Sequence, residues 1–311
     1  MYIAPKGTQL LEHLGTGSVF DVALVRHEGR TLICKRLSTR VLREPAGRAA
    51  IIREAQVLSL ASHPALPALI RVGADGHGPF ILETRREGSS LRDVLAGWQA
   101  RGRRPPRALV AYVVRAAVET LAELQELDAI DGSGPIELVH GDLAPDHLLL
   151  GAIGDIGLVD LGAARFRAMD PELETGDRGT LPFVAPEVAR GESPPTRRAD
   201  VYALAATLAH FATGAPLTRA RDEAAMLAEI GGGGVQLDAR FAEDTLAPAE
   251  RAALRRALSP DPADRPASAR ALLEAMGPPS GPSGPGGPDF GAAGSARSVA
   301  PSDGKVGADE A

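Results

Sequence analysis

The spacing of hydrophobic and polar positions changes along this chain and predicts two regions of different secondary structure. Residues 10–37 contain short, mainly apolar runs around a glycine turn, and residues 66–84 repeat that pattern around "DGHG". Such runs are typical of β-strands. Residues 47–61 instead have apolar positions at helical spacing, and the sequence "HPALP" follows. We therefore expect residues 1–84 to form a β-rich unit with one helix.

From residue 85 to residue 276 the pattern is mainly helical. The stretch 198–214, "RADVYALAATLAHFATG", is apolar on nearly every side and is expected to be a buried central helix. Other helices are expected around residues 89–98, 106–128, 247–259 and 265–276. The run "GGGG" at 231–234 is expected between helices, and without a preceding strand it does not indicate a phosphate-binding loop.

Beyond Met276 the composition changes to glycine, proline, serine and alanine, with three sizeable apolar side chains, Phe290, Val299 and Val306. A segment of this kind buries too little apolar surface to offset the entropy lost on ordering. Residues 277–311 are therefore predicted to be a disordered tail.

Charge and cysteine content limit the classes of function. The 311 residues have a net charge of −6, which argues against a general nucleic-acid-binding surface. The single cysteine, Cys34, excludes a disulfide framework and fits a reducing cytoplasm. The N-terminus does not have the pattern of a signal peptide. The longest apolar stretch, residues 201–214, is shorter than a membrane span, so we expect a soluble cytoplasmic protein.

Several glycines and charged residues occur at positions that suggest binding or catalysis. Gly15 and Gly17, between two expected strands, would allow backbone N–H groups to approach a polyphosphate. Strand alternation places Lys35 on an inward face, where its ammonium group needs an anionic partner, and Glu54 in the next helix is a candidate. Asp142, in a loop, and Asp160, in a strand-ending "VDLG", would suit a proton acceptor and a metal ligand.

In order and spacing, these motifs resemble those of the eukaryotic-type Ser/Thr protein kinases, which also occur in bacteria. The resemblance covers about residues 10–276. The motifs are "GTGSVFDV", Lys35, Glu54, "FILET", "HGDL", "DLG", "APE", Asp200 and Arg265. It implies an α+β, two-lobed kinase fold, with a β-rich N-lobe at 1–84 and a helical C-lobe at 85–276. It also implies that Arg265 pairs with Glu187.

The resemblance implies a role for each matching residue. ATP and Mg²⁺ would be the cofactors, and a protein would be the substrate or regulatory partner. Asp142 would accept the substrate proton, Lys35 would hold phosphates and be oriented by Glu54, and Thr180 would contact Asp142, as in serine/threonine-specific members. The nucleotide-binding positions are Gly15, Gly17, Val22, Ile33, Lys35, Glu83 and Leu149, with Glu83 in the hinge that touches adenine. Asp160 and His147 occupy the metal-binding positions.

Other residues depart from the family pattern. Phe20 replaces a variable third glycine, and Ile33 replaces a smaller residue over the adenine site. Gly141 replaces an arginine that grips a phosphorylated activation segment, so a phosphate on Thr175 would have no usual partner. Ala144 replaces a phosphate-binding lysine, and His147 replaces a metal-binding asparagine. Since imidazole suits softer ions than Mg²⁺, His147 could bind Mn²⁺ or Zn²⁺, although a lone histidine is more often a hydrogen-bonded structural group.

These departures leave three functions open. The first is a Ser/Thr protein kinase of reduced activity, which retains Lys35, Asp142 and Asp160. The second is a pseudokinase that acts as a scaffold or regulatory binding module. The third is a small-molecule kinase of the same superfamily, whose members often contain "HGDL"; "GTLPFVAPE" and "DPADRP" argue against it.

Overall fold

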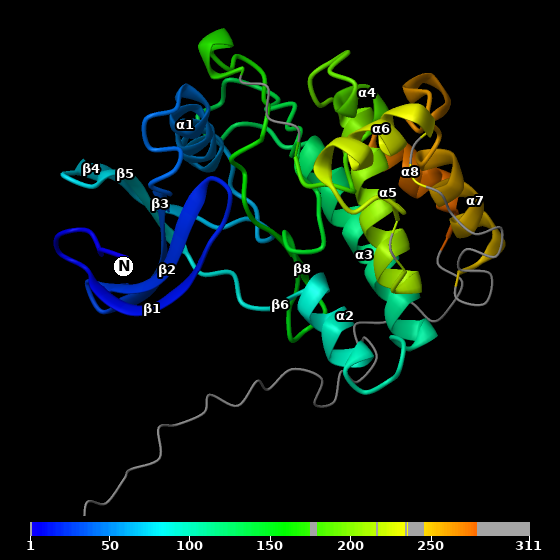
Figure 1. Cartoon of the computed structure of the whole chain (residues 1–311), viewed down its shortest axis with the longest axis horizontal. Helices are drawn as coiled ribbons and strands as arrows, with labels where there is room; N and C mark the ends of the chain where they lie inside the picture. Colours follow the sequence, from blue (N-terminus) through cyan, green and yellow to red (C-terminus); the bar gives the residue numbers. More distant parts are fainter. Residues whose placement is uncertain (1, 175–178, 216, 234, 236–245, 279–311) are drawn as a thin grey trace, which may run out of the picture.

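A β-sheet with one helix packed on it forms one part of the molecule, and a group of helices forms the other (Figure 1). The computed structural model describes residues 2–174, 179–215, 217–233, 235 and 246–278. This arrangement confirms the predicted α+β fold with a β-rich lobe followed by a helical lobe. The expected disordered tail, apart from its first two residues, lies outside the described residues, and so does Thr175, where a phosphate was expected to have no usual partner.

The N-terminal sheet has five antiparallel strands in the order β1-β2-β3-β5-β4. The strands are β1 (Gln9–Thr16), β2 (Phe20–His27), β3 (Arg30–Leu37), β4 (Leu69–Asp75) and β5 (Gly78–Thr84). The strand β5 thus ends at Thr84, the residue after which we expected the second region to begin. The five strands fall in the two regions, 10–37 and 66–84, where strand-like runs were predicted, and β1 begins one residue earlier.

Alternation along β3 places successive side chains on opposite faces of the sheet. Leu32 and Cys34 pack into a small core with Phe80 and Leu82 of β5. The intervening residues Ile33 and Lys35 point to the opposite face, as strand geometry requires. That face is partly covered by the helix α1 (Pro45–Leu60), whose Ala50 and Ile51 join a third cluster. The buried face of α1 therefore lies next to Lys35.

The helical lobe is built around two long helices. They are α3 (Arg107–Gln125) and α5 (Arg197–Thr213), and most of their side chains are buried in the largest core. Thr196 caps α5 by accepting a hydrogen bond from the Ala199 N–H, and Gly214 ends it with a left-handed φ of 65°. The remaining helices are α2 (Leu91–Gln99), α4 (Pro186–Ala189), α6 (Glu223–Gly233), α7 (Pro248–Ala257) and α8 (Ala269–Met276), with short 3₁₀ turns η1 (Pro171–Leu173) and η2 (Pro262–Asp264).

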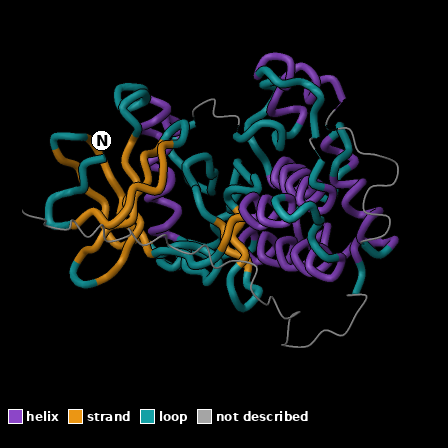
Figure 2. Tube along the Cα trace, turned by 60° about the horizontal axis from the view of Figure 1, so that its bottom comes forward, coloured by secondary structure: helices purple, strands orange, loops and turns teal. Residues whose placement is uncertain are grey.

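A second, three-stranded sheet lies between the five-stranded sheet and the helices (Figure 2). Its strands are β6 (Ser89–Ser90), β7 (Leu148–Leu150) and β8 (Ile156–Leu158), all antiparallel. The segments that precede β7 and follow β8 are tied together, because the Val159 N–H donates to the His147 carbonyl oxygen at 3.1 Å. This small sheet therefore brings the "HGDL" and "DLG" segments side by side.

The expectation that the "GGGG" run lies between helices was wrong. Its first three glycines form the C-terminal end of α6. Glycine is a poor helix former, but here its lack of a side chain permits close packing: a Cβ on Gly231 would lie 3.0 Å from Cγ of Arg190. The Arg190 guanidinium also donates to the Gly231 carbonyl oxygen at 2.8 Å. Contact with the α4 region therefore outweighs the low helix propensity.

Candidate active site

The ammonium group of Lys35 is buried between two carboxylates. It donates to Oε1 of Glu54 and lies 3.2 Å from Oε1 of Glu83. The side chain of Lys35 is 7% exposed, and the two glutamates are more deeply buried. Burial lowers the pKa of Lys35, but Glu54 and Glu83 outweigh that effect and leave the pKa above its ordinary value. The two carboxyl groups therefore favour the protonated form of Lys35.

The predicted pairing of Lys35 with Glu54 is present, and it reaches the segment that carries Asp160. Oε1 of Glu54 also accepts a hydrogen bond from the Leu161 N–H at 3.4 Å. Burial, partly offset by Lys35, raises the pKa of Glu54 to about 8. The ion pair thus links β3 and α1 to the residue that follows Asp160.

Backbone hydrogen bonds hold the loop that contains Asp142. The buried carboxylate of Asp200 in α5 accepts the N–H groups of His140 and Gly141 at 2.7 and 2.9 Å. Gly141 has a φ of 78°, and a Cβ there would lie 2.4 Å from the Ala163 carbonyl oxygen. A side chain at position 141 would therefore force the loop and the Ala163 carbonyl group apart. The loop conformation thus fits the glycine at this position.

Asp142 and Thr180 are in contact, as the sequence predicts. The Thr180 N–H donates to Oδ1 of Asp142 at 2.6 Å. Burial raises the pKa of Asp142, although His147 and Thr180 act in the opposite direction. The side chain is still 18% exposed. A partly accessible carboxylate with a raised pKa is suited to accept a proton from a hydroxyl group.

His147 lies between the two aspartates. Its Nδ1 is 2.7 Å from the Asp142 carbonyl oxygen, and its Nε2 is 3.5 Å from Oδ2 of Asp160. Burial lowers the pKa of His147, but Asp160 and Asp142 outweigh it and raise the pKa above its ordinary value. Asp160 has a lowered pKa: burial raises it, and His147 and Lys35 more than compensate. The two carboxylates thus favour the protonated form of the imidazole.

The donor set suits a hard divalent cation at Asp160 better than at His147. The Asp160 carboxylate is 37% exposed and offers the oxygen ligands that Mg²⁺ prefers. The His147 imidazole offers a nitrogen, which suits softer ions. Within the described ranges, no group of three or more histidine, cysteine, aspartate and glutamate side chains is arranged to hold a metal.

The expected nucleotide-binding residues Gly15, Val22, Ile33, Lys35 and Glu83 lie on four strands of the N-terminal sheet. Val22 of β2 is the cross-strand partner of both Gly15 and Lys35, and Ile33 of β3 is the partner of Glu83. The Gly17 N–H, expected to face phosphate, donates instead to the Phe20 carbonyl oxygen at 2.8 Å and closes the turn. Leu149 is half-buried in β7 of the small sheet.

The sequence analysis missed Arg53, which connects α1 to the segment after Asp160. Its guanidinium donates to the carbonyl oxygens of Gly162 and Leu173, each at 2.7 Å, and the residue is 2% exposed. Arg53 is three residues after Ala50 and four before Val57, both buried. A charged residue on the apolar face of a helix was the signal that could have identified it.

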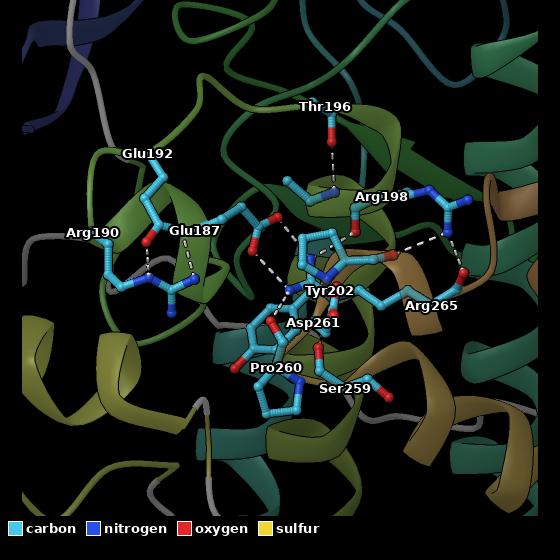
Figure 3. A network of polar contacts seen from close by, with 12 residues as sticks. Glu187, Arg190, Glu192, Thr196, Arg198, Tyr202, Ser259, Pro260, Asp261 and Arg265 are labelled. Atoms are coloured by element: carbon cyan, nitrogen blue, oxygen red, sulfur yellow. Dashed lines mark hydrogen bonds and ion pairs between the residues drawn. The ribbon is translucent and has the colours of Figure 1, made fainter.

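The predicted pair of Arg265 and Glu187 anchors the C-terminal lobe (Figure 3). The two side chains form a bidentate contact at 2.8 and 2.7 Å, and the Arg265 side chain is fully buried. The same guanidinium donates to the Ser259 and Pro260 carbonyl oxygens and lies 4.7 Å from the centre of the Tyr202 ring. This network fixes the segment 186–189, which follows Thr180, to the helices.

Comparison with known proteins adds to this geometry. The family described as "Protein kinase domain" matches residues 8–275. The serine/threonine-protein kinase PknD of Mycobacterium tuberculosis is 35% identical over 217 residues, which cover 68% of this chain and 30% of that protein. PknB of Mycobacterium leprae is 28% identical over 67% of this chain and 32% of its own length. PknL of Mycobacterium tuberculosis is 34% identical over 52% of this chain and 37% of its own length. The chain thus spans about a third of the length of these relatives.

Proposed function

The chain belongs to the protein kinase domain family, and we propose that it transfers the γ-phosphate of ATP to serine or threonine hydroxyl groups of proteins. The observation that carries this proposal is the 2.6 Å contact between the Thr180 N–H and Oδ1 of Asp142, formed while the buried Lys35–Glu54 pair is in place. This geometry supports Asp142 as the proton acceptor and Lys35 as the phosphate-binding cation. The names of the mycobacterial relatives support the serine/threonine preference.

Four residues have defined roles in the proposed reaction: Lys35, Glu54, Asp142 and Thr180. Phosphoryl transfer requires little covalent chemistry from the protein, so positioning and charge neutralisation dominate. Lys35 binds phosphate oxygens and Glu54 orients it. Asp142 accepts the proton of the incoming hydroxyl group, and Thr180 fixes the Asp142 carboxylate. ATP supplies the phosphoryl group.

The Asp160 carboxylate would hold a divalent cation, which neutralises negative charge on the phosphates. The adjacent His147 would favour Mn²⁺ over Mg²⁺ where its Nε2 joins the ligand set. A carboxylate that is 37% exposed is accessible to a cation that arrives with the nucleotide.

Typical kinases have a kcat of about 1–100 s⁻¹. We propose that the kcat of this protein is below that range. Ala144 supplies no charge to the γ-phosphate, and a charge-assisted hydrogen bond contributes roughly 1.5–3 kcal/mol. The loss of such a contact slows a reaction by roughly 10- to 150-fold. Ile33 adds bulk over the nucleotide, next to the buried Glu83.

A second candidate function is that of a pseudokinase, which binds a protein partner without catalysis. The observation that favours it is the 3.5 Å approach of His147 Nε2 to Asp160, because a cationic imidazole competes with a metal for that carboxylate. Gly17 also uses its N–H within the turn.

The test is a phosphorylation assay with a generic serine- and threonine-containing protein, ATP and either Mg²⁺ or Mn²⁺. We expect phosphoserine and phosphothreonine from the native chain and none from the Asp142→Asn variant. If the affinity for nucleotide does not depend on the metal and no phosphorylation occurs, the result would support the pseudokinase instead. Phosphotyrosine as the main product would contradict the proposed specificity.

A further inference from the structure

The second carboxylate beside Lys35, Glu83, has no role in the reaction described above. Its Oε1 lies 3.2 Å from the Lys35 ammonium nitrogen, and the residue is 2% exposed. Oε1 of Glu54 already accepts a hydrogen bond from the same ammonium group. One ammonium group is therefore shared between two buried carboxyl groups, and burial raises the pKa of each.

The sheet register explains how Glu83 reaches Lys35. Glu83 of β5 is directly opposite Ile33 of β3, so the two side chains point to the same face. Lys35 is two residues beyond Ile33 and also points to that face. A diagonal neighbour of this kind is within reach of a long side chain. The carboxylate of Glu83 thus points toward the phosphate-binding cation, although the sequence placed this residue in the hinge that touches adenine.

The two carboxylates are not equivalent. Glu54 accepts a second hydrogen bond, from the Leu161 N–H, and so ties Lys35 to the Asp160 segment. No such link is found for Glu83 in the part of the chain that the structure describes; the Oε2 atoms of both glutamates are buried there without a hydrogen-bond partner, so the Leu161 contact is what distinguishes them. The only charged neighbour of Glu83 within ion-pair distance there is Lys35. Glu83 therefore binds the ammonium group without coupling it to the catalytic loops.

We propose that Glu83 is an affinity-determining residue that competes with the phosphates of the nucleotide for Lys35. This inference rests on the proposed nucleotide binding and concerns the strength and selectivity of that same site. An ammonium group that is already paired with two carboxylates attracts a third anion weakly. The nucleotide phosphates therefore bind less tightly than they would beside a neutral residue at position 83.

The test compares adenosine, ADP and ATP with Mg²⁺ as ligands in calorimetric titrations of the native protein and Glu83→Gln. Glutamine keeps the shape and removes the charge. We expect ADP and ATP to bind at least about tenfold more tightly to Glu83→Gln, the size expected for one charged contact. Adenosine, which has no phosphate, should bind with the same affinity to both proteins. The affinity ratio of ADP to adenosine is the readout that a purely structural role would not change.

The control is Glu87→Gln, which removes the same charge from an exposed side chain that pairs with Arg85 at 3.4 Å. We expect no change in any affinity. Glu83→Met provides a second uncharged variant, and thermal unfolding of each protein without ligand shows that it is folded.

Two results would overturn the inference about Glu83 but leave the proposed nucleotide binding intact. The first is an unchanged ADP affinity in both uncharged variants. The second is an equal gain in affinity for adenosine and ADP, which would show that Glu83 affects binding of the adenine base and not of the phosphates. If neither the native protein nor a variant binds ADP or ATP, the proposed nucleotide binding fails, and the inference fails with it.

Discussion

Nε2 of His147 lies 3.5 Å from Oδ2 of Asp160, and Nδ1 of the same ring lies 2.7 Å from the Asp142 carbonyl oxygen. One imidazole thus contacts both segments, the one that carries Asp142 and the one that carries Asp160. The neighbouring charges raise the pKa of His147 despite its burial. In this position a protonated imidazole neutralises Asp160, and a neutral one offers a nitrogen ligand to a metal.

His147→Asn is expected to increase the rate with Mg²⁺ by about tenfold, equivalent to about 1.4 kcal/mol in the activation free energy. The substitution removes a cationic competitor from Asp160 and supplies an amide oxygen, the ligand type that Mg²⁺ prefers. The measurement is the initial rate of phosphorylation with Mg²⁺ and with Mn²⁺. An unchanged ratio of the two rates would contradict a role of His147 at the metal.

Arg53→Lys is expected to lower kcat by about tenfold while the affinity for ATP changes by less than about twofold. Lysine retains the charge but cannot donate to two carbonyl oxygens as the planar guanidinium does, and a hydrogen bond from a charged group contributes roughly 1.5–3 kcal/mol. The contacts to Gly162 and Leu173 position the segment after Asp160 rather than the nucleotide.

The matched control is Arg48→Lys, an exposed residue of the same helix, for which we expect native kcat and KM. An equal fall of kcat in both variants would show that the effect does not depend on the buried guanidinium.

Arg265→Ala is expected to lower the free energy of unfolding by about 3–5 kcal/mol, because it leaves the Glu187 carboxylate buried without its partner. Arg270→Ala removes an exposed ion pair with Glu126, whose side chains are 42% and 50% exposed, and should cost no more than about 1 kcal/mol. Urea unfolding of the three proteins measures both values. Similar losses for the two variants would contradict the assigned importance of burial.

Acid is expected to destabilise the fold through His140. Burial, reinforced by His147, lowers the pKa of His140 to about 3, whereas the ordinary value is about 6.5. Between these values the unfolded chain binds a proton that the folded chain does not. This contribution to stability is therefore complete above about pH 6.5 and declines as the pH falls toward 3.

The expected loss from this one group is about 1.4 kcal/mol between about pH 7.5 and about pH 5.5. The measurement compares urea unfolding of the native protein and His140→Asn at both pH values, and the variant should lack this part of the decline. His147 has a raised pKa, so its own linkage lies above about pH 6.5 and is common to both proteins. Identical declines would show that His140 is not the responsible group.

The sequence predicted those parts of the structure that follow from periodicity or from motifs. The five N-terminal strands, the buried helix α5 and the Lys35–Glu54 and Glu187–Arg265 pairs were all anticipated. The helical glycines at 231–233 were not, because their conformation depends on contact with Arg190 from a distant segment. Nor was the direction of Glu83, which depends on strand register. A one-residue shift in register would turn its side chain to the other face.

The most direct test of the central claim is the intact mass of the purified chain after incubation with ATP and Mg²⁺ or Mn²⁺, with Asp142→Asn treated in parallel. A generic protein substrate is present in each reaction, and its intact mass is measured as well. Our account predicts phosphate on the native chain or on the substrate, and on neither with Asp142→Asn. No phosphate on either protein with either metal, or equal phosphate with Asp142→Asn, would contradict catalysis by Asp142.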